Sequence, residues 1–389
     1  MPSHLSRLLI ALGAALAAAP ATLCGCANTG AASRPTFSWY SAQPDAQQSP
    51  TKAARITGPR VLALGNLRCG QAPSEARQAL SEFFLGERIE SGPGLVKPGA
   101  MAWQKDGLLV SDAGLGTLVR WPSAAHGLQP AVVSDESIRA AAVAACENGE
   151  FLVAIPASAA VHRYDARGRL VRRYLISSEF RPMGAAQIGR SIWVTNAARH
   201  NIEVFDSESG SSVRAIGQRG RGPGEFNLPM GIAALPKDHP LADGGAVVVD
   251  SFNARIQVLD SSGRWVRDLG GPGDITGRFG RPIGVAVGPD GAIFVLDAAS
   301  QRVHAFDERG KALLAFGRQT ADSHSLLLPG GVCVVPVVAE ATTLRRDAGV
   351  ELRPAYYVLV SEQLNRPGIR AYAWFETTAA SERIGLMTH

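Results

Sequence analysis

Cysteine is scarce in this sequence, with five in 389 residues. Cys24 and Cys26 lie close together near the N-terminus, and the other three are far apart. No Cys-x-x-Cys pair occurs among Cys69, Cys146 and Cys333, so the sequence has neither a disulfide framework nor the ligand spacing of a zinc site. We interpret these three residues as small buried hydrophobic side chains. The sequence allows one disulfide among these three cysteines and favours no particular pair.

Long runs of one charge are also absent. The net charge is +5, the charges are interspersed, and the basic runs do not exceed pairs such as Arg172-Arg173. A nucleic-acid-binding surface usually shows as clustered Lys and Arg. We therefore expect no nucleic-acid partner.

Several catalytic signatures are missing. There is no Gly-x-Ser-x-Gly nucleophile elbow, and the glycine-rich stretch 217–224 lacks the Gly-Lys-Ser/Thr of a phosphate loop and leads into a predicted strand. No two histidines have the spacing of a metal-binding pair; His162 and His304 fall in equivalent third strands of different repeat units. The sequence therefore predicts no catalytic residues of these kinds.

One apolar run is present, from Leu8 to Ala19, directly after Arg7. A transmembrane helix needs about twenty such residues, so this run is typical of a signal-peptide core. No second long apolar run follows it, and we expect no transmembrane helix in the rest of the chain.

Residues 23–26, Leu-Cys-Gly-Cys, follow this run and resemble the lipobox of bacterial lipoproteins, whose cysteine is acylated after cleavage. The resemblance implies a lipoprotein signal peptide at 1–25 and a lipid on Cys26. Ala27, in place of Asp, resembles the pattern of lipoproteins sent to an outer membrane, facing the periplasm or the cell surface. The alternative is ordinary cleavage near Ala19 or Ala21 with no lipid.

Composition divides the remainder into three parts. Residues 26–56 are rich in Ala, Ser, Thr, Gln and Pro with little periodicity, which predicts a flexible tether. Residues 57–377 carry the periodic pattern of a folded domain, and 378–389 are a C-terminal tail.

A Pro-x-Gly signature repeats along the folded part, about every 40 to 50 residues. Clear copies begin at Pro182, Pro229 and Pro282, related copies at Pro98 and Pro329, and a degenerate copy fits at 138–143. Six units result.

Each unit contains four short apolar runs separated by turns, which is the pattern of a propeller blade. The second run, as in Ile293–Leu296, is apolar at consecutive positions, so both of its faces are buried. The first run, as in Gly284–Val287, uses small residues that suit strands converging near an axis. We predict an all-β fold, a six-bladed β-propeller of four-stranded antiparallel blades; a pair of β-sandwiches is the competing fold.

The two units within 220–317 resemble the NHL repeat. Its pattern of a Gly-rich loop, Phe, Pro-x-Gly, a strand ending in Asp and an Asn-x-Arg-Ile strand is present as Gly220–Phe226, Pro229–Gly231, Asp250 and Asn253–Ile256. The match is partial at 182–217 and weak elsewhere. The resemblance implies a six-bladed NHL-like propeller, a fold commonly used as an interaction platform.

The apolar segment 60–64 precedes the first full unit. A terminal strand often completes the last blade of a propeller and removes its open edge. We predict that 60–64 pairs with the final unit near 369–374.

Two Asp–Arg pairs recur at a spacing of five residues, Asp250 with Arg255 and Asp297 with Arg302. Across a tight hairpin, the carboxylate can accept turn N–H groups and form a bidentate pair with the guanidinium. A single active site would not repeat from unit to unit, so we interpret these pairs as structural.

The loops between strands carry most binding functions in such folds. Arg199 and His200 lie in one predicted turn, and Arg219 and Arg221 lie in the glycine-rich loop. We take these four residues as candidate binding residues.

The leading hypothesis is a lipid-anchored, extracytoplasmic, non-catalytic binding or scaffold module for a protein or a cell-envelope polysaccharide, with no cofactor. The alternative is an enzyme, because six-bladed propellers include metal-dependent lactonases of the gluconolactonase type and peptidylglycine lyases. Such an enzyme would use an axial active site and bind Ca or Zn, but neither ligand set maps onto motifs of this sequence.

Overall fold

The computed structural model describes residues 39–41, 60–67, 95–104, 107–122, 129–131, 138–176, 179–317, 326–336, 344–345, 351–352, 354–364 and 367–375. The predicted signal peptide at 1–25, Cys26 and the tail at 378–389 lie outside these residues.

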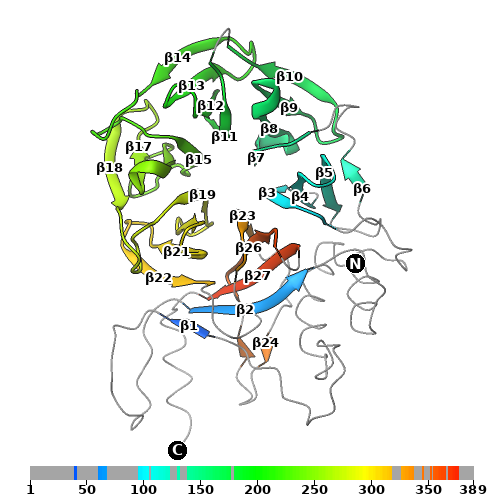
Figure 1. Cartoon of the computed structure of the whole chain (residues 1–389), viewed down its shortest axis with the longest axis vertical. Helices are drawn as coiled ribbons and strands as arrows, with labels where there is room; N and C mark the ends of the chain where they lie inside the picture. The colour runs from blue at the N-terminus through cyan, green and yellow to red at the C-terminus, as the bar shows by residue number, and fades with distance from the viewer. Residues whose placement is uncertain are drawn as a thin grey trace, which may run out of the picture.

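The described chain forms a ring of six antiparallel sheets (Figure 1). The first blade contains β3–β6, at Pro98–Gln104, Gly107–Asp112, Thr117–Pro122 and Gln129–Ala131. The second contains β7–β10, at Ala142–Ala145, Phe151–Ile155, Ala160–Tyr164 and Leu170–Tyr174. The third contains β11–β14, at Pro182–Ile188, Ser191–Asn196, Asn201–Asp206 and Ser212–Ile216.

The second half of the ring repeats this plan. The fourth blade contains β15–β18, at Pro229–Ala234, Ala246–Asp250, Arg255–Leu259 and Trp265–Gly270. The fifth contains β19–β22, at Pro282–Val287, Ile293–Asp297, Arg302–Phe306 and Ala312–Phe316. The sixth contains β23, β26, β27, β2 and β1, at Pro329–Pro336, Tyr356–Glu362, Gly368–Phe375, Arg60–Leu67 and Trp39–Ser41.

The remaining described elements are short. β24 at Leu344–Arg345 pairs with β25 at Glu351–Leu352. Three single-turn 3-10 helices, η1 to η3, lie at Glu147–Gly149, Pro156–Ser158 and Ser251–Asn253. Within the described residues, no helix is long and apolar enough to cross a membrane.

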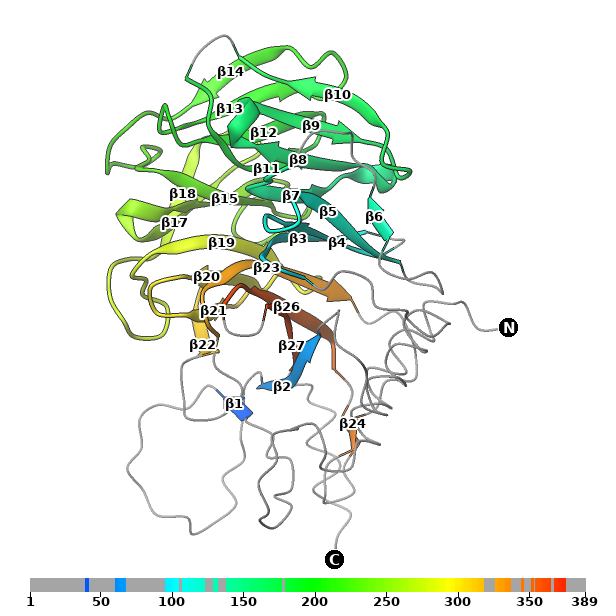
Figure 2. The ribbon, with the colours of Figure 1, turned by 45° about the vertical axis from the view of Figure 1, so that its right-hand side comes forward.

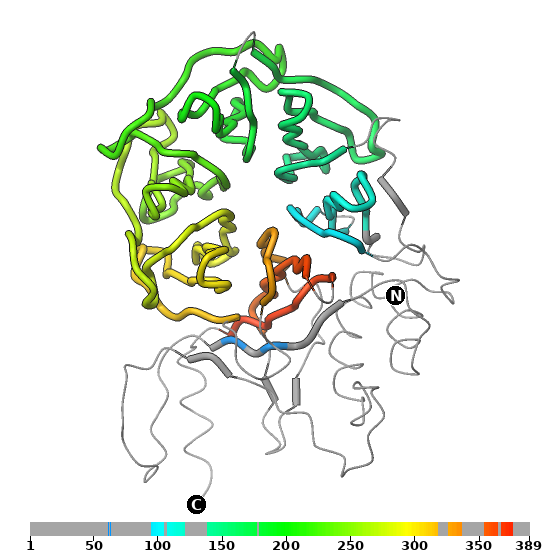
Figure 3. The backbone as a smooth tube through the Cα atoms, viewed as in Figure 1, coloured from blue at the N-terminus to red at the C-terminus, as the bar shows by residue number. Residues whose placement is uncertain are grey.

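The first strand of every blade lies nearest the axis of the ring, and the later strands follow outwards (Figures 1 and 3). The prolines at 98, 182, 229, 282 and 329 each begin such an inner strand, and the degenerate copy leads into β7. The predicted all-β, six-bladed propeller of four-stranded antiparallel blades is therefore confirmed.

Crowding between inner strands explains the glycine of the Pro-x-Gly signature. A Cβ on Gly184 would lie 2.5 Å from the Met230 carbonyl oxygen of the next blade, and one on Gly331 would lie 2.7 Å from the Gly99 carbonyl oxygen. Real Cβ atoms do not approach other heavy atoms this closely. Glycine at these positions lets adjacent inner strands meet near the axis.

The hydrophobic core is divided among the spaces between neighbouring blades. The second strands β8, β16, β20 and β26 are buried along their whole length, and the run of consecutive apolar residues in each predicts this burial on both faces. Each buried cluster contains residues of two adjacent blades; Val247 and Val249 of the fourth blade, for example, pack with Ile293 and Val295 of the fifth. Every blade thus depends on its neighbours for burial.

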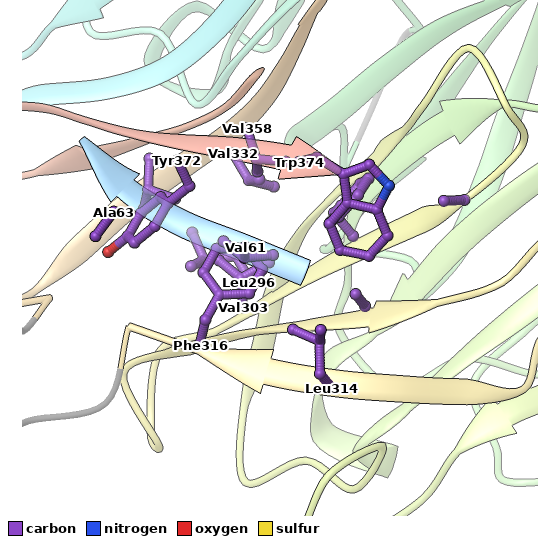
Figure 4. Packing of buried hydrophobic residues seen from close by; sticks show 14 of the residues in the cluster. Val61, Ala63, Leu296, Val303, Leu314, Phe316, Val332, Val358, Tyr372 and Trp374 are labelled. Atoms are coloured by element: carbon purple, nitrogen blue, oxygen red, sulfur yellow. The ribbon is translucent and has the colours of Figure 1, made fainter. Parts of the chain in front are cut away.

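The ring is closed in the sixth blade by the strand from the N-terminal side. β2 pairs antiparallel with β27, with Val61 opposite Trp374, which confirms the predicted pairing. Figure 4 shows Val61 and Ala63 of β2 among side chains of the fifth and sixth blades that include Phe316 and Tyr372. The turned view in Figure 2 also shows β2 beside β27.

β1 extends this blade by a further strand. Trp39–Ser41 pairs with residues 60–62 of β2, although it lies within the segment 26–56 that the sequence predicts to be a tether. Trp and Tyr favour strands, and β2 offers a free edge at this place. The rest of 26–56 lies outside the described residues.

Candidate functional site

The antiparallel blades place their loops on two faces of the ring. The upper face, as we name it, contains the loops that lead into the first strands and the loops between second and third strands. The lower face contains the loops between first and second and between third and fourth strands. Arg199, His200, Arg219 and Arg221, the candidate binding residues, all lie on the upper face.

In five blades, the second strand ends in a buried polar side chain that holds a loop of the upper face in place. These residues are Asp112, Asn196, Asp250, Asp297 and Glu362. Each accepts at least one backbone N–H from the loop that leads into its own blade. Because these groups are almost fully buried, the loops are attached to the core of the propeller.

Asp250 and Arg255 hold the glycine-rich loop. The Arg255 Nε donates to Asp250 at 2.9 Å, and its Nη1 donates to Asp268 at 2.8 Å. Its Nη2 donates to the carbonyl oxygens of Gly222 and Glu225 at 2.8 and 2.9 Å. The guanidinium therefore donates to two carboxylates and to the loop. It does not form the expected bidentate pair with Asp250 alone.

Asp297 and Arg302 act on the corresponding loop of the fifth blade. Asp297 accepts N–H groups from Gly280 and Arg281 at 3.0 and 2.7 Å. Arg302 donates from Nη1 to the Asp274 carbonyl oxygen at 3.2 Å. Burial acts to raise the pKa of Asp297, but the hydrogen bonds from the backbone N–H groups of Gly280, Arg281 and Ala299 outweigh it and lower the pKa overall.

The glycine-rich loop is further held by its own carboxylate. Glu225 accepts the N–H groups of Arg221 and Gly222 at 3.1 and 2.9 Å and the side-chain amide of Gln218 at 3.0 Å. The Gln218 hydrogen bond, followed by the backbone ones, lowers the pKa of Glu225. With the loop so fixed, the side chains of Arg219 and Arg221 are exposed on the upper face.

His200 links two blades. Its Nδ1 accepts the N–H of Leu228, in the loop that leads into the fourth blade, at 3.0 Å. Burial, followed by the positive charge of Arg219, lowers the pKa of His200. The neighbouring Arg199 lies 3.7 Å from both Glu179 and Glu203. His200 is thus engaged in holding a loop, whereas Arg199 is partly exposed.

Buried polar side chains also recur at the third position of the third strands, where His162, Glu203, Gln257 and His304 lie opposite valines of the second strands. The His304 Nδ1 accepts the Gly277 N–H at 3.1 Å, as the Gln257 Oε1 accepts the Gly224 N–H at 2.9 Å. These positions belong to different blades. Within the described part of the chain, no three His, Cys, Asp or Glu side chains are grouped so as to hold a metal ion.

A cavity of about 420 Å³ lies where three inner strands end at the lower face. It is lined by Ala234, Leu235, Pro236, Val287, Gly288, Pro289, Val334 and Pro336. This lining has no ionisable side chain, so the cavity offers apolar contact and no acid–base group.

Two of the three cysteines that follow Cys26 lie in the described residues. Cys146 and Cys333 are free thiols, and burial raises the pKa of each to about 12. Thiols of so high a pKa are poor nucleophiles, consistent with small hydrophobic side chains. Cys69 lies outside the described residues.

Exposed large hydrophobic side chains are distributed unevenly. On the upper face they are Val96, Leu175, Phe252, Ile275, Leu328 and Leu364. All the others within the described residues, namely Leu170, Val171, Val213, Trp265 and Val266, lie on fourth strands at the circumference. Sequence reasoning missed this distribution because periodicity predicts burial within strands and is silent on loops.

Residues 279–306 match the family model of the NHL repeat. This match confirms the resemblance seen in the sequence for that part of the fifth blade. The chain is thus a six-bladed propeller that carries an NHL repeat.

Among curated proteins, part of the chain is similar to E3 ubiquitin-protein ligase NHLRC1. Identity is 32% over 149 residues with the Mus musculus protein, covering 35% of this chain and 34% of that protein. It is 28% over 149 residues with the Rattus norvegicus protein, covering 35% of each. The matched segment thus spans about a third of the length of these relatives.

Solved structures share the fold at low identity. A streptogramin B lyase aligns with a TM-score of 0.50 and 12% identity, covering 72% of this chain and 93% of that one. A protein of unknown function from Bacteroides thetaiotaomicron aligns with a TM-score of 0.53 and 12% identity, covering 74% of this chain and 72% of that one. At such identity these similarities establish the fold alone.

Proposed function

We propose that this chain is a non-catalytic binding module that receives a protein partner on its upper face. The observation that carries this proposal is the placement of the exposed large hydrophobic side chains, which among the loops occur on the upper face alone within the described residues. Apolar side chains gathered on one face of a soluble domain are typical of interaction sites.

The rigidity of the upper face supports the same function. Its loops are hydrogen-bonded to buried groups such as Asp112, Asp250 and Asp297, so little conformational entropy is lost when a partner binds. The resemblance to NHL repeats adds support, because NHL-like propellers commonly serve as interaction platforms.

A crosslinking experiment tests the proposal. A photoreactive amino acid is placed at Phe252 or Ile275 on the upper face, and at Val213 or Val266 on the circumference as a matched control. We expect one protein to be crosslinked from the first pair of positions and not from the second. That protein is then purified and its affinity for the propeller is measured. The double variant Phe252→Ser, Ile275→Ser should weaken binding more than tenfold. The control double variant Val213→Ser, Val266→Ser should change it less than twofold. Equal effects of both pairs would contradict the proposal.

The enzymatic alternative, a metal-dependent lactonase or lyase with an axial site, has its own test. Metal analysis is made on the purified domain that begins near Ala53. Stoichiometric Ca, Mg or Zn, lost on substitution of an Asp or Asn near the axis, would overturn the non-catalytic proposal.

We further propose that the module is exported and anchored by a lipid on Cys26. This part is carried by the sequence of residues 1–27, which lie outside the described residues. Cys26→Ala should abolish palmitate labelling and release the protein from the membrane fraction. Continued labelling of the variant would contradict lipidation at this residue.

A further inference from the structure

We infer that the partner presents an acidic polypeptide segment, which binds where Lys97, Arg181 and Arg281 surround the axis of the upper face. This inference rests on the proposed function, because it names the chemistry of the partner that the upper face receives.

The three cations occupy equivalent places in alternate blades. Each is the residue before the proline that begins an inner strand, in the first, third and fifth blades. Inner strands lie nearest the axis (Figure 3), so the residues that precede them surround the axis on the upper face. All three side chains are exposed.

The backbone at each cation is fixed by a buried group. The Lys97 N–H donates to Asp112 at 2.9 Å, and the Arg281 N–H donates to Asp297 at 2.7 Å. The Arg181 N–H donates to the side-chain carbonyl of Asn196 at 3.0 Å. The positive charges are thereby placed by the core of the propeller, and only their side chains adjust to a ligand.

These cations are not neutralised within the described part of the chain. No carboxylate of a described residue lies within 4.0 Å of the charged groups of Lys97, Arg181 or Arg281. An external carboxylate therefore meets donors for which no carboxylate of the described residues competes.

The surroundings of the three cations reinforce the positive potential. Further exposed cations on the upper face are Arg139, Arg219, Arg221 and Arg278, whereas Arg199 is paired with Glu179 and Glu203. The acidic side chains in its described loops are fewer, namely Glu179, Glu225 and Asp274, and Glu225 is engaged by its own loop. On the lower face, the acidic side chains of the described loops outnumber the basic ones. This difference in charge orients an acidic partner toward the upper face.

The apolar side chains among these cations favour a polypeptide over a nucleic acid. Single-stranded nucleic acids bind by stacking bases on aromatic rings beside basic groups. Of the exposed large hydrophobic residues on the upper face, Phe252 is aromatic and the rest are aliphatic. Aliphatic side chains with arginines suit a segment that carries both carboxylates and apolar side chains.

Fluorescence anisotropy with a labelled peptide of alternating Glu and Leu tests this inference. Lys97→Gln, Arg181→Gln and Arg281→Gln are combined in one variant, which keeps the backbone hydrogen bonds of these residues. The matched control combines Arg169→Gln, Arg190→Gln and Arg309→Gln, three exposed arginines of the lower face. Thermal unfolding verifies that both variants are folded.

We expect the upper-face variant to weaken peptide binding about tenfold or more and the control less than about twofold, with wild-type binding weakening as salt is raised. Absence of wild-type binding, or equal loss in both variants, would overturn the inference. So would tighter binding of poly-uridine or of phosphatidylglycerol vesicles that is lost in the same variant. A partner crosslinked at Phe252 that binds the upper-face variant as well as the wild type would refute the acidic segment while leaving the proposed function standing.

Discussion

At the scale of single residues, the buried His304 makes the stability of the fifth blade sensitive to acid, whereas its counterpart in the fourth blade, Gln257, does not titrate. His304 uses Nδ1 to accept the Gly277 N–H, and burial lowers its pKa from 6.5 to about 4. Gln257 makes the equivalent contact to Gly224 with an uncharged amide. The two blades therefore hold equivalent loop N–H groups with side chains that differ in their response to acid.

This difference predicts an acid-dependent stability. Because His304 is neutral in the folded protein, its contribution to the free energy of unfolding is fully present above pH 6.5. This contribution is lost as the pH falls from 6.5 to about 4. The free energy of unfolding should fall by up to about 3 kcal/mol more in the wild type than in His304→Gln over this range. Urea unfolding at pH 7.5 and pH 4 measures the difference.

The reciprocal substitution provides the control. Gln257→His should introduce a similar additional loss in acid, whatever its effect at neutral pH. An identical pH dependence in the wild type and His304→Gln would show that His304 does not titrate as its surroundings imply.

The roles of the Asp and Arg residues were only partly predictable at this scale. Their recurrence from unit to unit identified Asp250, Arg255, Asp297 and Arg302 as structural candidates. The spacing of five residues gave no sign that Arg255 also reaches Asp268 and the carbonyl oxygens of the glycine-rich loop, because those groups come from other segments of the chain. Local spacing predicts local contacts, and the loop contacts depend on the tertiary fold.

At the scale of elements, the inner strands depend on glycine where they touch. Gly184→Ala places a Cβ 2.5 Å from the Met230 carbonyl oxygen and should lower the free energy of unfolding by about 1–3 kcal/mol. Gly284 has the same place in the fifth blade, but the nearest atom to its Cβ, in Val332, is 3.5 Å away. Gly284→Ala should therefore be tolerated, and chemical denaturation compares the two. Equal stabilities would contradict the proposed role of crowding.

The closing strand is a second element with a measurable consequence. β2 is hydrogen-bonded to β27, and Val61 is fully buried between the fifth and sixth blades. Hydrogen exchange should show residues 60–67 protected to a degree similar to 369–375, because both belong to one sheet. Rapid exchange at 60–67 beside a protected 369–375 would exclude closure by this strand.

The elements were the most predictable part of the molecule. Pro-x-Gly spacing located the inner strands, and the uninterrupted apolar runs identified second strands buried on both faces. β1 escaped prediction because Trp39–Ser41 stands alone in a polar segment, and its pairing depends on the free edge of β2. Short strands of this kind are determined by their partner more than by their own sequence.

At the scale of the whole molecule, the two loop faces differ in a way that no local pattern reveals. The residues that make the upper face basic and apolar are scattered from Val96 to Leu364 and come together only when the ring closes. The sequence identified Arg199, His200, Arg219 and Arg221 from two loops, whereas Lys97, Arg181 and Arg281 emerge from their equivalent places before inner strands. Residues from equivalent places in different blades form one face only in the closed ring, so this face could not be predicted from local sequence patterns.

The central claim, that the upper face receives a protein partner, is tested most directly by hydrogen exchange of the propeller with and without the partner identified by crosslinking. We predict that binding slows exchange in the upper-face loops 217–228 and 271–281 and leaves the lower-face loops 207–211 and 260–264 unchanged. Protection confined to the lower-face loops or to the fourth strands would contradict the claim.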